Sequence, residues 1–162
     1  MIYGWIIGGL AALDLGVKSV VEGQEDETFP RELPSAKGLI KLHKNHNSGF
    51  PFGFMKERPE LVKGIPLMVI SAMAGALAGM MQDKGKTGEK LGLSLVMGGA
   101  LSNLYDRVMR GYVVDYFTIE WKSLKKVVFN LGDMFVFLGS AVFVLAQAVK
   151  SLEEAGVKKK KK

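Results

Sequence analysis

Two aspartates of this chain each lie beside a long apolar run. They are Asp115, which ends the motif that starts at Asn103, and Asp133, which follows Asn130 by three residues. A carboxylate next to apolar sequence is costly, and it persists mainly where a site uses it. Two carboxyl groups brought close together cannot both ionise, so they tend to share one proton. The ionised member can activate a water as general base while the protonated member polarises or protonates the scissile group. We therefore predict that Asp115 and Asp133 form a catalytic pair.

A structural role is the alternative for both aspartates. Asp is favoured at the start of a helix, where its carboxylate accepts hydrogen bonds from free backbone N–H groups. Asp133 precedes a long apolar run, so it is well placed to cap a helix. The two residues alone do not separate a capping role from a catalytic one.

Four segments that are almost free of charge are the elements that must position these residues. The chain is 48% hydrophobic, but its mean hydropathy is only +0.17, because its charges gather in loops and in the C-terminal tail. A bilayer core of about 30 Å needs about 20 helical residues. The apolar segments are residues 2–21, 65–81, 91–105 and 127–149. Three fit this length, and the short third one must either extend through Asp106 and Arg107 or lie where the bilayer is thin. The pattern predicts a mainly α membrane protein with four transmembrane helices.

The domain organisation follows from these segments. Residues 1–150 are expected to form a single four-span membrane domain, in which residues 22–63 are an extracytoplasmic insertion of short strands and turns. Residues 151–162 are expected to be a basic cytoplasmic tail. Its lysine run, Lys158 to Lys162, is either a disordered solvated end or a segment attracted to an anionic leaflet. The first segment has no basic region before it, so we expect it to be a retained span.

The distribution of positive charge predicts the orientation. Four spans place both termini on one side together with residues 82–90, and this side carries nine Lys and Arg in 22 residues. The other side carries twelve in 63 residues. Because the positive-inside rule weights density in short loops, both termini are expected in the cytoplasm. Asp115 and Asp133 then meet at the outer face of the membrane.

Composition excludes several classes of site. The absence of cysteine rules out disulfides, thiolate catalysis and cysteine metal sites. His43 and His46 have no obvious third ligand, so a surface or loop role is favoured over metal binding. No metal and no other cofactor is expected. The net charge of +6 does not indicate nucleic acid, since residues 22–63 hold seven acidic and seven basic side chains.

Other polar residues are expected at the same outer interface. Asp14 and Lys18 are four apart on one helical face, and we interpret them as a structural pair that supports the site. Asn103, Asn130 and Arg107 can donate hydrogen bonds to carboxylates. The segment 47–53 is either a turn whose aromatic residues pack on an apolar surface or a loop whose backbone and Asn47 amide approach a substrate.

Small residues predict close helix packing in two segments. The second apolar segment carries Ser71, Gly75 and Gly79 at four-residue spacing, a pattern that lets another helix approach closely. The third carries several glycines and Ser102, for which close packing is also the simplest explanation.

Taken together, these motifs resemble the signal peptidase II family, the bacterial lipoprotein signal peptidases. Residues 98–107 running on to 111–117 resemble the family's signature, and residues 129–133 resemble its second aspartate motif. Residues 47–53 resemble its Asn-x-Gly loop, and Asp14 with Lys18 resembles its first-helix pair. The match runs in order from Asp14 to about Gly139.

The resemblance implies a four-helix membrane aspartic endopeptidase with a small extracytoplasmic β cradle between helices 1 and 2. Such an enzyme hydrolyses the peptide bond N-terminal to the diacylglyceryl-modified cysteine of prolipoproteins, in the bacterial cytoplasmic (inner) membrane. It implies membrane lipids and globomycin-type inhibitors as further partners, and no nucleic acid. The residues implied to bind substrate or support the pair are Asn47, Gly49, Asn103, Asp106, Arg107, Asn130, Asp14 and Lys18.

Two departures from the family pattern lead to further expectations. The family usually has Ala at the position of Gly132, so we expect Gly132 to loosen the start of the fourth helix, at a cost of ~1 kcal/mol. It usually has small residues at Phe50 and Pro51, which are expected to reshape the loop that contacts the substrate. Two other functions stay open. One is a catalytically silent homologue that binds lipidated peptides, and the other is a small proton or ion transporter that uses Asp14, Asp115 and Asp133.

Overall fold

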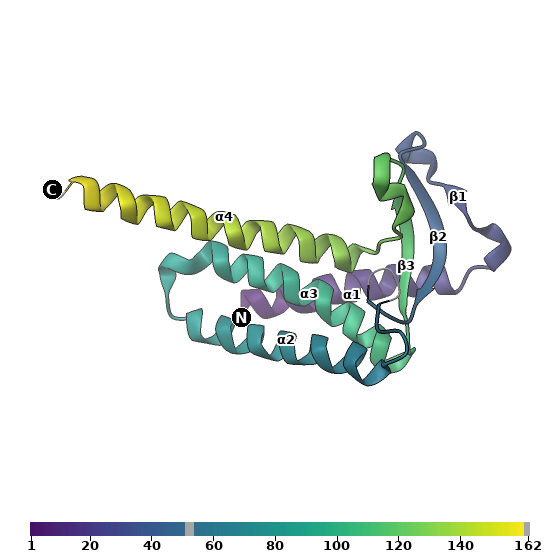
Figure 1. Ribbon diagram of the computed structural model, residues 1–162, viewed down its shortest axis with the longest axis horizontal. Coiled ribbons are helices and arrows are strands. Elements are labelled where there is room, and N and C mark those ends of the chain that lie inside the picture. Colours follow the sequence, from purple (N-terminus) through teal and green to yellow (C-terminus); the bar gives the residue numbers. More distant parts are fainter. Residues whose placement is uncertain (51–53, 161–162) are drawn as a thin grey trace.

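Four long helices lie side by side, and a small sheet stands across one end of them (Figure 1). The computed structural model describes residues 1–50 and 54–160, with side chains up to residue 155. The helices are α1 (Ile2–Glu22), α2 (Pro59–Met80), α3 (Thr87–Met109) and α4 (Leu131–Lys160). Both termini and the α2–α3 connection lie at the end away from the sheet. Pro51, Phe52 and Gly53, predicted above to belong to a substrate loop, lie outside the described residues, as do Lys161 and Lys162.

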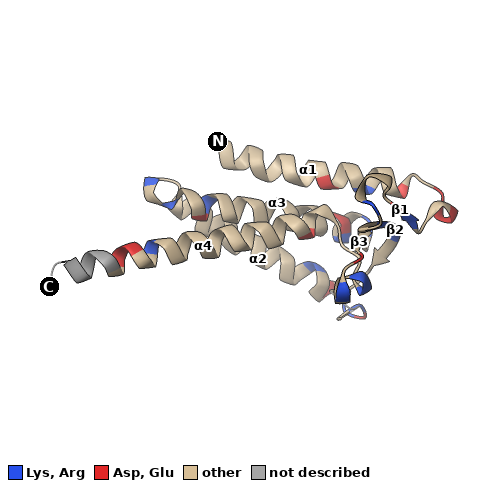
Figure 2. Ribbon diagram, turned by 90° about the horizontal axis from the view of Figure 1, so that it is seen from above, with Lys and Arg blue, Asp and Glu red and all other residues tan. Residues whose placement is uncertain are grey.

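Three of the four helices are long and apolar enough to cross a membrane, namely α1, α2 and α4. They expose apolar side chains on their outer faces, for example Trp5, Met68 and Leu145. Long stretches without charge separate the charged residues at the two ends of the bundle (Figure 2). Helices α2 and α3 begin before the predicted apolar segments, because turns that carry charged side chains continue them at the membrane boundary. Helix α4 begins at Leu131, four residues after the predicted start at residue 127, because Phe129 pairs with the sheet.

Helix α3 is the central helix, since it contacts each of the other three. It buries Glu89, Lys90, Asp106 and Arg107, side chains that a helix surrounded by lipid would avoid. A helix enclosed by others needs little apolar surface, because its polar groups find partners within the protein. This position explains why the third apolar segment is the shortest of the four.

Two glycine pairs bring α3 and α4 into close contact. A Cβ atom on Gly92 would lie 2.8 Å from the carbonyl oxygen of Gly139, and one on Gly139 would lie 2.6 Å from that of Gly92. A Cβ atom on Gly99 would overlap the carbonyl group of Gly132. The close packing predicted for the third segment is therefore confirmed.

The corresponding prediction for the second segment is wrong within the described residues. Ser71, Gly75 and Gly79 are exposed, and no other part of the described chain comes within 4 Å of a Cβ atom on either glycine. The hydroxyl of Ser71 donates instead to the carbonyl of Leu67 in the same helix, at 2.8 Å. Helix α2 packs on α3 through the face that carries Ile70 and Leu77.

The sheet contains three antiparallel strands in the order β1 (Arg31–Glu32), β2 (Ile40–Asn47) and β3 (Val113–Ile119). Strands β1 and β2 lie between α1 and α2, as expected. The central correction to the predicted fold is β3, because it lies between α3 and α4 and supplies Asp115 from a strand. Its β-branched and aromatic residues, VVDYFTI, favour a strand, and most of them are buried.

The segment between β3 and α4 returns to the sheet before the helix begins. The backbone N–H of Phe129 donates to the carbonyl of Phe117, and the carbonyl of Phe129 accepts from Tyr116 and Phe117. This isolated bridge fixes residue 129 alongside β3. Asn130 consequently enters α4 next to Asp115.

Candidate active site

The two predicted aspartates line the same cavity, at the junction of the sheet and the helix ends. The cavity has a volume of about 610 Å³. Asp115 reaches it from β3, and Asp133 reaches it from the first turn of α4. Asn47, Asn103 and Arg107 also line it. Five residues that are distant in the sequence thus converge on one cavity.

Each oxygen of Asp115 accepts a hydrogen bond from a side-chain amide. Nδ2 of Asn130 donates to Oδ1 at 2.7 Å, and Nδ2 of Asn47 donates to Oδ2 at 3.3 Å. The oxygen of each amide is occupied elsewhere, since Asn130 accepts from the backbone of Asp133 and Asn47 accepts from the backbone of Gly49. Both amides are therefore oriented with their N–H groups toward Asp115.

Burial, followed by the nearby charge of Asp133, raises the pKa of Asp115 from 3.8 to about 6. The hydrogen bonds from Asn130 and Asn47 oppose this rise in pKa. Burial dominates because the side chain is removed from water at the base of the cavity, where an ionised carboxylate loses hydration. The protonated form of Asp115 is thus accessible at mildly acidic pH.

The Asp133 side chain accepts hydrogen bonds at the start of a helix. Its Oδ2 accepts from the backbone N–H of Asn130 at 3.1 Å, while its own N–H donates to Oδ1 of Asn130 at 2.9 Å. This reciprocal pair resembles a capping box. Its Oδ1 accepts from Nδ2 of Asn103 at 3.0 Å. The capping alternative is therefore correct for Asp133 as a matter of geometry, and it coexists with the position of the carboxylate in the cavity.

Arg107 connects the cavity to the loop that follows β2. Its Nη2 donates to the carbonyl of Gly49 at 3.2 Å, and its Nη1 donates to the carbonyl of Asn103 at 3.3 Å. Its Nε is buried and has no hydrogen-bond acceptor among the described residues. The guanidinium lies over the Phe50 ring, with 5.6 Å between its carbon and the ring centroid. Phe50 thus contacts the site through Arg107.

The other predicted site residues lie behind the cavity. Asp14, Lys18 and Asp106 are fully buried and do not line the cavity. Nζ of Lys18 lies 2.8 Å from Oδ2 of Asp14 and 3.2 Å from Oδ2 of Asp106. Asp106 also accepts from the backbone N–H of Val114 at 3.1 Å, which ties α3 to the strand that carries Asp115. These residues support the site and do not face its cavity.

Two members of this buried network were not predicted. The hydroxyl of Ser102 donates to Asp14 at 2.5 Å, and the hydroxyl of Tyr116 donates to the other oxygen of Asp14 at 3.0 Å. Tyr116 also accepts from the backbone N–H of Leu131, at 2.9 Å. Burial and the charge of Asp14 raise the pKa of the Tyr116 phenol far above its ordinary value, so Tyr116 remains a donor. The sequence feature that could have identified Tyr116 as a site residue is its position directly after Asp115.

Gly132 does the opposite of what was expected. A Cβ atom there would lie 2.8 Å from Oδ2 of Asp14, 2.9 Å from Oδ1 of Asn130 and 3.0 Å from the carbonyl of Gly99. The missing side chain therefore allows α1, α3 and α4 to meet closely beside the site. Gly132 tightens the start of α4 and does not loosen it.

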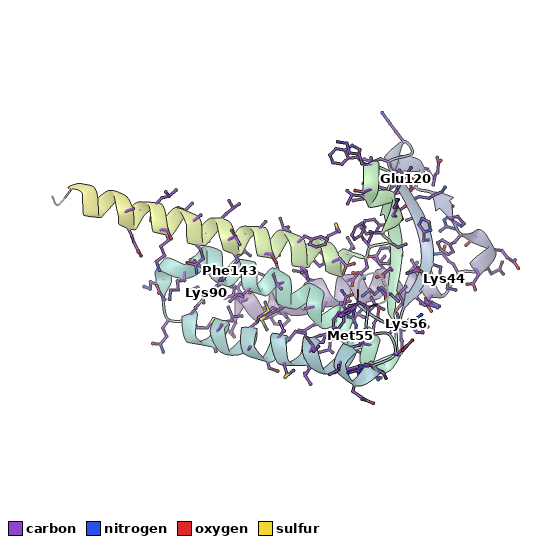
Figure 3. The ribbon with its side chains drawn as sticks, viewed as in Figure 1. Lys44, Met55, Lys56, Lys90, Glu120 and Phe143 are labelled. Atoms are coloured by element: carbon purple, nitrogen blue, oxygen red, sulfur yellow. The ribbon has the colours of Figure 1, made fainter. Side chains whose placement is uncertain are left out.

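The cavity has an apolar side and a basic rim. Val136 and Phe137 of α4 line it, and Phe137 is 58% exposed on the outer face of that helix. Lys56 and Lys126 line it near the sheet. Figure 3 shows Lys56 at the sheet end and Lys90 at the opposite end of the bundle. The cavity can therefore receive a chain that is apolar along α4 and polar near the sheet.

The histidines lie on the sheet and belong to no cluster of metal ligands. Nε2 of His46 lies 2.7 Å from a carboxylate oxygen of Glu22, and Nε2 of His43 lies 3.2 Å from the hydroxyl of Thr118. Among the described residues, no group of three or more His, Asp and Glu side chains is arranged to hold a metal ion. His46 also lines the cavity, beside Asn47.

Comparison with known proteins gives one consistent family. The family described as signal peptidase (SPase) II matches residues 6–149. Lipoprotein signal peptidases of Brucella ovis and Brucella canis are each 30% identical over 141 residues, which cover 83% of this chain and 82% of theirs.

Solved structures show the same fold. A bacterial membrane enzyme determined by the in meso method at 2.3 Å has a TM-score of 0.77 at 18% identity, and the match covers 93% of this chain and 89% of that one. A second, determined at 1.9 Å, has a TM-score of 0.75 at 19% identity, and this match covers 90% of this chain and 92% of that one.

Proposed function

The chain belongs to the signal peptidase II family of bacterial multi-pass membrane peptidases that process lipoproteins, and we propose that Asp115 and Asp133 are its catalytic pair. The reaction is hydrolysis of the peptide bond on the N-terminal side of the diacylglyceryl-modified cysteine of a prolipoprotein. The observation that carries this proposal is the convergence of the two carboxyl groups on one cavity with an apolar side along α4. A lipidated peptide has the matching chemistry, since it is apolar in its acyl chains and signal segment and polar at the scissile bond.

The two acids take different roles. Asp115 carries the shared proton, because burial and the charge of Asp133 raise its pKa to about 6. The proton sits on Oδ2, whose hydrogen bond from Asn47, at 3.3 Å, is the longer of the two that Asp115 accepts. We assign Asp133 as the ionised partner, because it accepts from a backbone N–H at the start of α4 and lies at the positive end of that helix's dipole, features that Asp115 lacks.

The reaction then follows the logic of a carboxylate pair. Asp133 takes a proton from a water molecule while the water oxygen forms a bond to the scissile carbonyl carbon. Asp115 gives its proton to the carbonyl oxygen. When the tetrahedral intermediate collapses, the C–N bond breaks and the nitrogen takes the proton from Asp133, while Asp115 recovers its own.

The membrane arrangement is part of the proposal. We take α3 as the fourth span, because its 23 residues reach about 35 Å and the hydrocarbon core is about 30 Å thick. The sheet is then extracytoplasmic, and both termini are cytoplasmic in the inner membrane. The acyl chains of the substrate lie along the exposed face of α4 near Phe137.

Transport is the weaker alternative. Helix α3 buries polar groups at both ends, with Lys90 and Ser94 at one and Ser102 and Asp106 at the other. Between Ser94 and Ser102, every residue of α3 is apolar or glycine. A proton or ion path along α3 would have to cross two helical turns without a polar side chain.

The proposal is tested by incubating the purified protein in detergent with a diacylated prolipoprotein and following release of the signal peptide on a gel. Mass spectrometry identifies the cleaved bond, and the unlipidated precursor is the control for lipid dependence. Asp115→Asn and Asp133→Asn are each expected to lower turnover by at least 1000-fold, and a globomycin-type inhibitor is expected to block the parent protein. Binding of the precursor without product would identify a catalytically silent homologue. Unchanged turnover in either variant would refute the proposed pair.

A further inference from the structure

Lys18 is a buried cation with more acceptors than it has protons. Its side chain is fully buried, and its ammonium group can donate three hydrogen bonds. Four oxygens surround Nζ: Oδ1 of Asn103 at 2.7 Å, Oδ2 of Asp14 at 2.8 Å, Oγ of Ser102 at 3.1 Å and Oδ2 of Asp106 at 3.2 Å. The shortest contact is to the amide of Asn103, not to a carboxylate. Neutralising two acids does not require that contact.

The contact decides which way the Asn103 amide faces. An ammonium group cannot accept a hydrogen bond, so the oxygen of Asn103 must point to Lys18. The amide nitrogen then points the other way, to Oδ1 of Asp133 at 3.0 Å. If Lys18 were absent, the amide could turn over and present its oxygen to Asp133.

We propose that Lys18 is a positioning residue for peptide hydrolysis, which acts through Asn103 to keep Asp133 the ionised member of the pair. A donor hydrogen bond favours the charged form of a carboxylate, whereas an amide oxygen favours the protonated form. A cation bound to the amide oxygen also strengthens donation from the nitrogen of the same amide. This inference rests on the proposed roles of Asp115 and Asp133.

Charge alone does not account for the arrangement. The buried network on α1 and α3 holds two positive and two negative charges. Nη1 of Arg110 lies 3.1 Å from Oδ1 of Asp106, so Arg110 adds the second positive charge beside Lys18, and the two balance Asp14 and Asp106. The network behind the cavity is therefore neutral as a whole. The other charged or titratable groups that face this network or Asp133 are Arg107 from α3 and Asp115 and Tyr116 from β3, with His46, Lys56 and Lys126 lining the cavity. Lys18 consequently acts on Asp133 mainly through the orientation of the amide.

A purely structural role for Lys18 makes a different prediction. If Lys18 only neutralises Asp14 and Asp106, its removal lowers stability and leaves the pH dependence of the reaction unchanged. If Lys18 orients Asn103, its removal lets Asp133 take up a proton at higher pH. The acid limb of the pH profile then moves upward, because activity requires ionised Asp133.

The test uses the double variant Asp14→Asn/Lys18→Met, which removes one positive and one negative charge and leaves the buried network neutral. The pH profile of kcat/KM is measured on a diacylated prolipoprotein. We expect an upward shift of the acid limb by about one pH unit, which corresponds to a loss of up to about tenfold in kcat/KM at pH values on that limb. Ser102→Ala is the matched control, because it removes another ligand of Lys18 but leaves the contact to Asn103, and its acid limb is expected to stay in place.

A second variant covers the case in which the double variant does not fold. Asn103→Leu removes the donor to Asp133 and leaves both ion pairs of Lys18, so the same upward shift is expected. The inference is overturned if the double variant folds and its acid limb lies at the same pH as that of the parent. It is also overturned if the acid limb of Asn103→Leu lies at the parent's pH.

A readout without turnover separates this inference from the proposed function. In an Asp115→Asn background, the carboxyl stretching band of Asp133 is followed by infrared difference spectroscopy as the pH changes. Adding Asp14→Asn/Lys18→Met should move the titration of this band to higher pH. A titration at the same pH as before counts against the action of Lys18 on Asp133 through Asn103. A parent protein that does not cleave the lipidated precursor counts against the proposed function alone.

Discussion

Replacing Asp115 by Asn is expected to stabilise the folded protein at pH 8 while it removes activity. Burial and the charge of Asp133 raise the pKa of Asp115 from 3.8 to about 6. One pKa unit corresponds to about 1.4 kcal/mol, so ionised Asp115 costs the folded state up to about 3 kcal/mol. Asn carries no charge at any pH and avoids that cost.

The gain is reduced by one mismatched hydrogen bond. Both oxygens of Asp115 accept from amide N–H groups, of Asn130 and of Asn47. The amide of the Asn variant has only one oxygen, so its NH₂ group faces one of the two amide N–H donors. The lost hydrogen bond lowers the free energy of unfolding by about 1 kcal/mol. The net stabilisation is therefore about 1–2 kcal/mol at pH 8.

The dependence of this gain on pH has a defined sign. Below pH 3.8 the carboxyl of Asp115 is protonated in both the folded and the unfolded chain, so its burial carries no ionisation cost. As the pH rises from 3.8 to about 6, the unfolded chain releases its proton before the folded protein does, and the cost grows. The cost is constant above that range. The advantage of the variant should thus appear over this interval and persist at pH 8.

Asp133→Asn is the matched control, since it also replaces one carboxylate by an amide at the cavity. Asp133 accepts from the backbone N–H of Asn130 and from the Asn103 amide, and it lies at the start of α4. Losing one of these hydrogen bonds and the favourable interaction with the helix dipole costs about 1–2 kcal/mol. This variant is therefore expected to be less stable than Asp115→Asn at pH 8.

The assay is thermal unfolding of the three proteins in the same detergent between pH 4 and pH 8, followed by circular dichroism, with cleavage of a lipidated precursor measured in parallel. At pH 8 the midpoint of Asp115→Asn is expected to lie above those of both the parent and Asp133→Asn. If Asp115→Asn unfolds below the parent at pH 8, the assignment of Asp115 as a buried, destabilising acid is wrong.

Two further predictions concern the site and the helix contact. Because Asp115 must be protonated to act as an acid, kcat/KM should fall as the pH rises through about 6. Asn47→Ala should move that fall to higher pH, because it removes a hydrogen bond that lowers the pKa of Asp115. Both effects are measured from pH profiles of precursor cleavage. Gly99→Ala should destabilise the protein by about 1–3 kcal/mol, because its methyl group would overlap the Gly132 carbonyl. Gly132→Ala should also destabilise it, whereas Gly75→Ala, which has open space in α2, should stay within about 1 kcal/mol of the parent. Thermal unfolding decides between these outcomes, and a more stable Gly132→Ala protein would contradict the close approach at that position.

The parts of the site that could be predicted from sequence are those written in short motifs. Apolar runs of helical length predict the spanning helices, and the residues around Asp115 and Asp133 identify the cavity side chains. Even the choice between a cap and a catalytic residue at Asp133 could be posed from sequence. In the structure the Asp133 carboxylate both accepts from the backbone at the start of α4 and lines the cavity, so its capping role leaves the proposed catalytic role open.

The parts that could not be predicted depend on contacts between distant segments. Tyr116 donates to Asp14, 102 residues away, and Ser102 donates to the same carboxylate from 88 residues away. No local pattern distinguishes such a serine from one that only packs. The strand that carries Asp115 was missed for a related reason, since it pairs with a strand formed about 70 residues earlier, as in the pairing of Asn45 with Asp115.

The glycine contacts of α3 and α4 connect the packing of the bundle to the geometry of the acids. Gly92 faces Gly139 and Gly99 faces Gly132, so two pairs at seven-residue spacing hold the antiparallel helices at backbone contact. Asn103 lies one turn beyond Gly99, and Asp133 follows Gly132 directly. A side chain at either pair would separate the helices, and a separation of even 1 Å would break the 3.0 Å hydrogen bond between Asn103 and Asp133. The glycines therefore matter to the reaction through distance, since they allow a lysine on α1 to influence an acid on α4 through a single amide on α3.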